Sequence, residues 1–98
     1  MKMTNDKKIL IVGLGLIGGS YARALIKKGY HVSAITRSAS SIAYALENGI
    51  ITQGSHQIDP EMIGQADIVI FALYPHVFVE WIEKNQHLLM LIFLFTAI

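Results

Sequence analysis

The residues of this chain best suited to chemistry are three glycines, Gly13, Gly15 and Gly18, which follow a short apolar run. In a turn with this Gly-x-Gly-x-x-Gly spacing, the first glycine permits a tight bend and the second lets the backbone approach a diphosphate. The third lets the next helix pack closely on the strand, and free N–H groups at the start of that helix donate to the diphosphate. The motif predicts a dinucleotide-binding site whose cofactor-binding residues in this turn are Gly13, Leu14, Gly15, Leu16, Ile17 and Gly18.

The elements around the glycines have the order that such a site requires. Four β-formers precede Gly13, and an apolar face then recurs at helical spacing until Gly29. A second strand, His31–Thr36, follows at once, so the strand–helix–strand unit closes within about 30 residues. The predicted helical face consists of Ile17, Tyr21, Ala24 and Leu25. The alternative interpretation is a parallel α/β sheet in which the glycines serve close packing alone.

The end of the second predicted strand bears on the choice of dinucleotide. Folds that prefer NAD usually place an acid there, which accepts hydrogen bonds from the adenosine ribose. Here Thr36, Arg37 and Ser38 occupy that place, and a guanidinium pairs with a 2′-phosphate through charge-assisted hydrogen bonds. We therefore expect NADP as the cofactor, with NAD as the alternative, and Ser38, Ser40 or Ser41 as auxiliary donors. Arg37 also fits a solvated residue beside a helix cap.

The remaining segments alternate between helix and strand signals. A hydroxyl-rich run, 37–41, caps a second helix, and Ile50–Gln53 predicts a short strand after it. The residues 59–61 supply an N-cap, a first-turn proline and an acid, which predict a short third helix. The apolar run 68–73 predicts a strand buried on both faces, and Pro75 begins a fourth helix.

This alternation predicts the α/β class, with a Rossmann-like, doubly wound parallel sheet that is incomplete at about four to five strands. We expect residues 1–87 to form a dinucleotide-binding domain, with its ligand at the carboxyl ends of the strands. The residues 88–98 form an uncharged, apolar tail. The tail fits a buried fifth strand, and it also fits a truncated or frameshifted end. It is shorter than the roughly 20 residues that span a bilayer.

Composition narrows the classes of partner. The net charge is +1 and the basic residues are scattered, so nucleic-acid binding has no electrostatic support. The chain has no cysteine, which removes disulfides and thiolate chemistry and agrees with a cytoplasmic location. Its four histidines lie far apart, without the spacing of a metal site. We expect a small-molecule ligand, no metal, no nucleic acid and no membrane.

Four segments of the chain share a family pattern: 13–20, 28–30, 45–50 and 66–75. Together they resemble the N-terminal NAD(P)-binding domain of prephenate dehydrogenases, over about residues 7–87. The Leu-Ile-Gly-Gly-Ser continuation is more specific than the glycine spacing, because β-hydroxyacid dehydrogenases more often place a methionine before the third glycine. The departure lies in the tail, where the family usually continues with a Lys-Pro-Gly turn and a strand carrying an aspartate.

The resemblance implies an NADP(H)-dependent oxidative decarboxylation of prephenate, or of the related arogenate, in tyrosine biosynthesis. It implies that Arg37 lies on the adenosine ribose side and that Leu73, Tyr74 and Pro75 line the cofactor edge. The catalytic histidine of the family lies further along the fold, and His76 does not match its position. The substrate-binding arginine lies in a helical dimerisation domain. We therefore expect no catalytic residue here, no turnover by this chain alone, and homodimerisation only with that helical domain.

Two other classes of function remain open from the sequence. One is a non-catalytic nucleotide-binding or interaction module that needs a partner to cover its apolar tail. The other is a different Rossmann reductase, such as a β-hydroxyacid dehydrogenase, which keeps the cofactor and changes the substrate.

Overall fold

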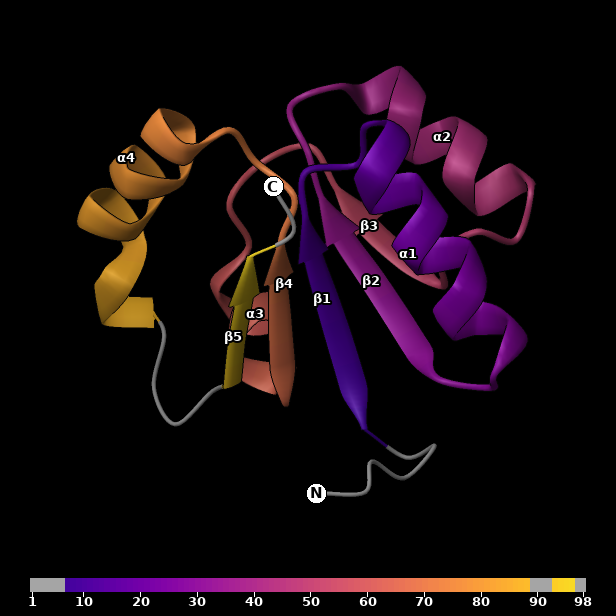
Figure 1. The fold of residues 1–98 in the computed structure, drawn as a ribbon. Helices are drawn as coiled ribbons and strands as arrows, with labels where there is room; N and C mark the ends of the chain where they lie inside the picture. The colour runs from indigo at the N-terminus through magenta and orange to yellow at the C-terminus, as the bar shows by residue number, and fades with distance from the viewer. Residues whose placement is uncertain (1–6, 89–92, 97–98) are drawn as a thin grey trace.

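Strands and helices alternate along the described part of the chain, which comprises residues 7–88 and 93–96 of this computed structural model. The five strands form one parallel sheet in the order β3-β2-β1-β4-β5 (Figure 1). In chain order the elements are β1 (Lys8–Val12), α1 (Leu16–Lys27), β2 (His31–Ile35), α2 (Ala39–Glu47), β3 (Gln53–Ser55), α3 (Pro60–Gln65), β4 (Ile68–Phe71), α4 (Pro75–Asn85), the 3-10 turn η1 (Gln86–Leu88) and β5 (Phe93–Thr96). The predicted α/β class is confirmed.

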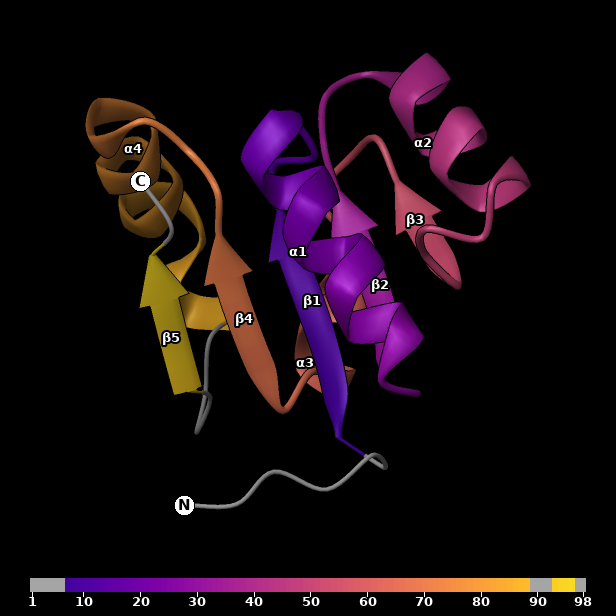
Figure 2. The ribbon, with the colours of Figure 1, turned by 45° about the vertical axis from the view of Figure 1, so that its right-hand side comes forward.

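Helices cover both faces of the sheet, α1 and α2 one face and α3 and α4 the other (Figure 2). Along β1 the side chains alternate: Ile9 and Ile11 join the apolar cluster under α1 and α2, and Leu10 and Val12 join the cluster under α3 and α4. All four are at most 3% exposed. Burial of each such side chain is worth about 1.5–3 kcal/mol. The apolar residues of β1 therefore hold both helical layers, which makes the sheet doubly wound as predicted.

Two reciprocal hydrogen bonds join the start of β1 to the start of β4. The N–H of Lys8 donates to Oδ2 of Asp67 at 2.8 Å, and the N–H of Asp67 donates to the carbonyl oxygen of Lys8 at 2.8 Å. They fix a register that begins at Ile9 opposite Ile68. Because of this register, β1 and β4 also end level with each other.

The third strand begins later than the sequence predicts. Ile50 and Ile51 are buried, but both of their N–H groups donate to the carbonyl oxygen of Ala45 in the last turn of α2, at 2.8 and 3.4 Å. These two residues pack the end of α2 against the sheet and do not themselves pair with a strand. The predicted strand Ile50–Gln53 was therefore wrong, and pairing with β2 covers Gln53–Ser55. The apolar side chains of Ile50 and Ile51 correctly indicated that these residues are buried. They did not show whether the backbone there pairs within the sheet or bonds to the end of a helix.

The buried face of α1 also differs from the predicted one. Tyr21 is 45% exposed, whereas Ala22 is fully buried and Leu25 and Ile26 pack partly against the core. The reason is the close approach of Gly18 to the end of β1, described below, which fixes the rotation of the helix about its axis. Positions four and seven or eight residues after Gly18 then face the sheet.

The last two strands lie side by side at one edge of the sheet. β4 is two residues shorter than the predicted run 68–73, because the chain turns away after the N–H of Ala72 donates to the carbonyl oxygen of Val12 at 2.9 Å. β5 runs parallel to β4, with Ile68 opposite Phe93. The other predicted tail residues at 89–92 and 97–98 lie outside the described residues.

Polar side chains cap α2 and α3, as the sequence predicts. Oγ of Ser38 accepts a hydrogen bond from the N–H of Ser41 at 3.2 Å, and Oδ1 of Asp59 accepts one from the N–H of Met62 at 3.1 Å. Pro60 lies in the first turn of α3, where a missing N–H costs nothing.

We expect Asp59→Ala to lower the free energy of unfolding by about 1 kcal/mol, because the N–H of Met62 loses its acceptor. Chemical denaturation followed by circular dichroism measures the change. Asp59→Asn keeps an acceptor oxygen and should stay within about 0.5 kcal/mol of the parent chain. Equal stabilities of Asp59→Ala and the parent chain would contradict the capping role.

Candidate functional site

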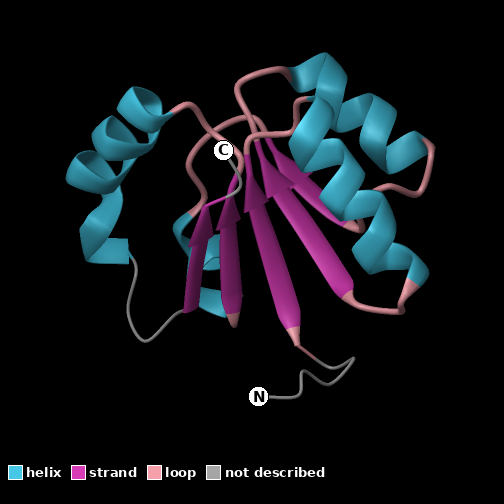
Figure 3. Cartoon of the chain, in the orientation of Figure 1, coloured by secondary structure: helices cyan, strands magenta, loops and turns pink. Residues whose placement is uncertain are grey.

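The carboxyl ends of the parallel strands all lie at the same end of the sheet (Figure 3). Gly13 is the first residue beyond β1 at this end. Its φ is +95°, a conformation that side chains disfavour. A Cβ added there would lie 2.6 Å from the carbonyl oxygen of Ala72 and 2.9 Å from Cδ2 of Leu73. On the other side, the N–H of Gly13 donates to the carbonyl oxygen of Ile35 at 2.8 Å. The chain therefore turns at Gly13 in a space between β2 and the end of β4 that is too narrow for a side chain.

Gly18 brings the first turn of α1 onto this bend. A Cβ added to Gly18 would overlap the carbonyl oxygen of Gly13 and would lie 3.3 Å from Cβ of Ala72. The helix and the strand end thus touch through backbone atoms. This is the close packing expected of the third glycine in the motif.

No contact with the described residues requires a glycine at the position of Gly15. A Cβ added there would meet nothing within 4 Å, and its φ of −76° suits any residue. The open space in front of Gly15 is what a diphosphate needs to lie close to the backbone. The residues present therefore fit a dinucleotide at this turn.

Backbone donors surround the same space. The N–H of Gly19 donates to the carbonyl oxygen of Gly15 at 2.8 Å, which is the first hydrogen bond of α1. The N–H groups of Leu16, Ile17 and Gly18 precede it, and such first-turn groups have no acceptor within their own helix. No side chain caps α1 and no acid lies in its first turn. The positive end of the helix dipole is therefore available to an anion.

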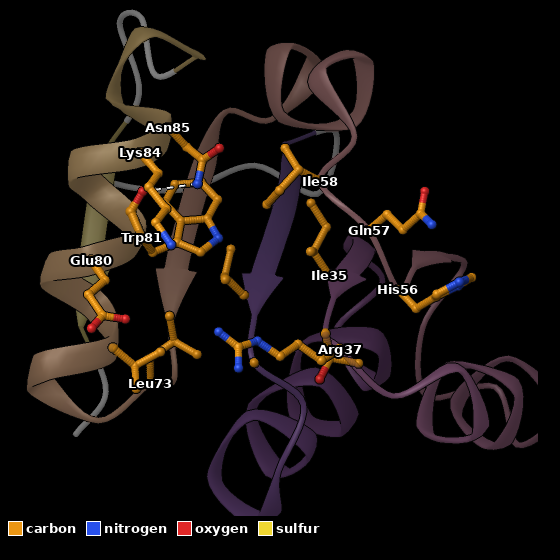
Figure 4. A pocket seen from close by; sticks show the side chains of 14 residues that line it. Ile35, Arg37, His56, Gln57, Ile58, Leu73, Glu80, Trp81, Lys84 and Asn85 are labelled. Atoms are coloured by element: carbon orange, nitrogen blue, oxygen red, sulfur yellow. Dashed lines mark hydrogen bonds between the residues drawn. The ribbon is translucent and has the colours of Figure 1, made fainter.

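A cavity of about 440 Å³ opens at the carboxyl ends of the strands (Figure 4). One wall is the loop after β3, and the opposite wall is α4. Figure 4 shows the side chain of Arg37 directed into the cavity between these walls. The lining residues are Val12, Gly13, Ile35, Thr36, Arg37, His56, Gln57, Ile58, Leu73, Val77, Glu80, Trp81, Lys84 and Asn85.

The structure separates the predicted cofactor residues into groups. Those that line this cavity are Gly13, Thr36, Arg37 and Leu73. Leu14 and Gly15 line a second cavity between α1 and α2. Ser38 is the N-cap of α2, and Tyr74, which is 70% exposed, precedes Pro75 at the start of α4. Their contact with a cofactor stays a prediction.

Sequence reasoning missed two walls of the cavity. The loop 56–58 carries no motif, and only the structure places it beside the end of β2. On α4, Val77 and Trp81 have the helical spacing of a packing face, and Trp81 does pack edge-on to Phe71 with ring centroids 5.0 Å apart. The same helical face continues into Lys84, which lines the cavity. Nothing local in the sequence shows that this face borders a cavity.

The described residues hold neither a cluster of metal ligands nor a helix that could span a membrane. Among residues 7–88 and 93–96, no three histidine, aspartate or glutamate side chains gather as metal ligands would. None of the described helices is both long and apolar enough to cross a bilayer.

Comparisons with known proteins identify relatives of this chain among oxidoreductases. The family model described as NADP oxidoreductase coenzyme F420-dependent matches residues 8–90. Arogenate dehydrogenase from Synechocystis is 25% identical with a TM-score of 0.84, over 93% of this chain and 32% of that chain. Prephenate dehydrogenase from Aquifex aeolicus, in complex with hydroxyphenyl propionate and NAD+, is 25% identical with a TM-score of 0.81, over 97% of this chain and 34% of that chain.

An imine reductase from Bacillus cereus shares the fold, with 23% identity and a TM-score of 0.78 over 93% of this chain and 31% of that chain. No curated protein sequence matches. The chain thus spans about a third of the length of these structures, 31–34%. The family model nevertheless covers most of the chain, and its match agrees with the glycine turn and the parallel sheet. The chain belongs to this NADP oxidoreductase family and forms an NAD(P)-binding Rossmann domain with the resemblance to prephenate dehydrogenases that its sequence indicates.

Proposed function

We propose that this chain is the NADP(H)-binding part of a prephenate or arogenate dehydrogenase. The observation that carries the binding half of the proposal is the open space in front of Gly15, which no described part of the protein fills. The substrate half is supported by two neighbours with these activities, each 25% identical over most of the chain. When bound, the cofactor supplies the hydride acceptor for an oxidative decarboxylation.

The residues of this chain bind and orient the cofactor. The first-turn N–H groups of α1 would donate to its diphosphate, and Leu73, Tyr74 and Pro75 would border it at the end of β4. No catalytic residue is assigned to this chain. Prephenate or arogenate, and a homodimer, belong in this proposal to the whole enzyme with its helical domain.

Arg37 favours NADP over NAD. Its guanidinium has no hydrogen bond or ion pair with the described residues, and it points into the cavity (Figure 4). Thr36 and Ser38 beside it add hydroxyls, so no carboxylate lies at this strand end to repel a phosphate. Among the described lining residues, Glu80 is the one carboxylate, and it lies on α4.

We expect calorimetric titration of the full chain to show tighter binding of NADPH than of NADH. Arg37→Asp should weaken NADPH binding by roughly tenfold or more, because a hydrogen bond to a charged group is worth about 1.5–3 kcal/mol. The same substitution should change NADH binding much less, since NADH has no 2′-phosphate.

Lys28→Asp is the matched control, because it makes the same change of charge on an exposed residue just beyond the end of α1. We expect it to leave the ratio of the two affinities unchanged. Equal affinities of the parent chain for NADPH and NADH, or an unaltered NADPH affinity in Arg37→Asp, would rule out the role of Arg37.

A second candidate keeps the cofactor and changes the substrate. The matching family model is described as an NADP oxidoreductase without reference to prephenate. Activity assays on a full-length protein that carries this domain decide between the two. Turnover of prephenate or arogenate supports the first candidate, and its absence with an active, NADPH-binding enzyme supports another reductase.

A further inference from the structure

The single tryptophan of the chain, Trp81, contacts both the core and the cavity at the strand ends. Its indole packs edge-on to Phe71, with ring centroids 5.0 Å apart, and Figure 4 shows it reaching from α4 toward the cavity. Phe78 makes the same kind of contact with Phe71, at 4.9 Å, but does not line the cavity. Packing on Phe71 therefore accounts for an aromatic ring at position 81 but not for an indole.

The indole N–H of Trp81 lacks a protein acceptor. Nε1 of Trp81 makes no hydrogen bond to any residue that the structure describes. No described side-chain nitrogen or oxygen is both fully buried and unpaired, so Nε1 stays accessible from the cavity. An indole nitrogen can only donate, and an enclosed tryptophan N–H usually finds an acceptor. A ligand with an acceptor atom at this place would supply the missing partner.

The wall opposite Trp81 is apolar. Ile35, at the end of β2, is buried, and Ile58, in the loop after β3, is 41% exposed. Both line the cavity, and Figure 4 shows them across from Trp81. Apolar surfaces on two sides suit a flat ring, because both of its faces are then removed from water. The side chain of Arg37 is directed into the same cavity.

We propose that Trp81 recognises the adenine base of the cofactor by donating its indole N–H to a ring nitrogen of the adenine. This inference rests on the proposed function and adds to it a residue that determines which base is bound. Adenine is the one part of NADP(H) that is flat, uncharged and supplied with unprotonated ring nitrogens. The ring nitrogen of nicotinamide is alkylated and cannot accept, and a phosphate between apolar walls would lose its solvation.

The indole N–H supplies a direct measurement, because one tryptophan gives one indole cross-peak in the NMR spectrum of the full, ¹⁵N-labelled chain. Adenosine 2′,5′-bisphosphate is the probe, since it carries the base without the nicotinamide. We expect it to shift this resonance saturably. Ribose 5-phosphate, which has no base, should leave the resonance in place at equal concentration and ionic strength.

Trp81→Phe keeps an aromatic ring beside Phe71 and removes the N–H. It should weaken binding of the bisphosphate, and of NADPH, by roughly threefold to tenfold in calorimetric titrations. Phe78→Leu is the matched control, because it alters the other ring on Phe71 outside the cavity. It should lower the melting temperature and retain the affinity of the parent chain.

Three results would overturn the role of Trp81 and leave the proposed function standing. They are an indole resonance that saturating NADPH does not shift, equal affinities of Trp81→Phe and the parent chain, and an equal loss of affinity in Phe78→Leu. A parent chain that binds no NADPH would overturn both proposals. The expected effects at Trp81, in a full-length enzyme that turns over neither prephenate nor arogenate, would count against the proposed function alone.

Discussion

Gly15→Ala is expected to remove most of the affinity for nicotinamide dinucleotides while leaving the fold intact. The added methyl group meets no protein atom within 4 Å, and the backbone conformation at this position suits alanine. A diphosphate held against the backbone would meet that methyl group. Overpacking of this kind costs about 1–3 kcal/mol, which corresponds to roughly one to two orders of magnitude in the dissociation constant.

Calorimetric titration with NADPH measures this loss, and denaturation of the same sample checks the fold. Gly64→Ala is the matched control, because its added methyl group also meets nothing within 4 Å and Gly64 lies in α3, outside both cavities. Gly64→Ala should retain the affinity of the parent chain. An undiminished affinity in Gly15→Ala would show that no diphosphate lies at this turn.

Gly18→Ala is expected to lower the free energy of unfolding by about 3 kcal/mol, the upper part of the usual range for overpacking. The added methyl group would collide with the carbonyl oxygen of Gly13, a backbone atom that has no rotamer to adopt. Gly13 is itself held between Ile35 and Ala72, so relief requires α1 to lift from the sheet. This cost opposes the gain of about 0.5–1 kcal/mol that alanine brings to an unconstrained helix position.

The neighbouring variant isolates the collision from that general gain. Gly19→Ala lies on the same helix in open space, so we expect it to stabilise the chain by about 0.5–1 kcal/mol. Urea denaturation of the two variants should therefore differ by about 4 kcal/mol in unfolding free energy. A difference under about 1 kcal/mol would mean that the helix moves away at little cost, contrary to the packing described.

Features whose partners lie close in sequence could be predicted. The caps at Ser38 and Asp59 each bond an N–H three residues later, so residue type and position sufficed. The glycine turn could be predicted for a similar reason, because the positive φ at Gly13 and the tight contact at Gly18 belong to one short segment.

Features that depend on distant contacts could not be predicted in detail. Ile50 and Ile51 look like a strand, but the carbonyl group of Ala45 takes their N–H groups and delays β3. Tyr21 has the spacing of a buried residue, but the position of Gly18 against the strand end turns it outward. In both cases the pattern showed which segments are apolar, and packing decided how each one is used.

The residues of the candidate site also include some that could be predicted from the sequence and some that could not. Arg37 could be assigned to the end of the second strand because it directly follows the residues predicted to form that strand. The cavity in front of it also needs α4 and the loop 56–58, which reach it only through the arrangement of the whole sheet. Trp81 was therefore predicted as a packing residue but not as part of a cavity wall.

The hydrogen bonds between β1 and β4 also bear on how quickly the native state is reached. Contacts within the β3-β2-β1 half close short loops: Ser33 bonds Ile9 across 24 residues and Thr52 bonds Val32 across 20. The bond from Lys8 to Asp67 spans 59 residues. Closing a longer loop costs more chain entropy, about 0.6 kcal/mol for each doubling, and non-local contacts slow folding. We therefore expect the pairing of β1 with β4 to be the slow step of folding. The carboxyl ends of these same two strands support the glycine turn.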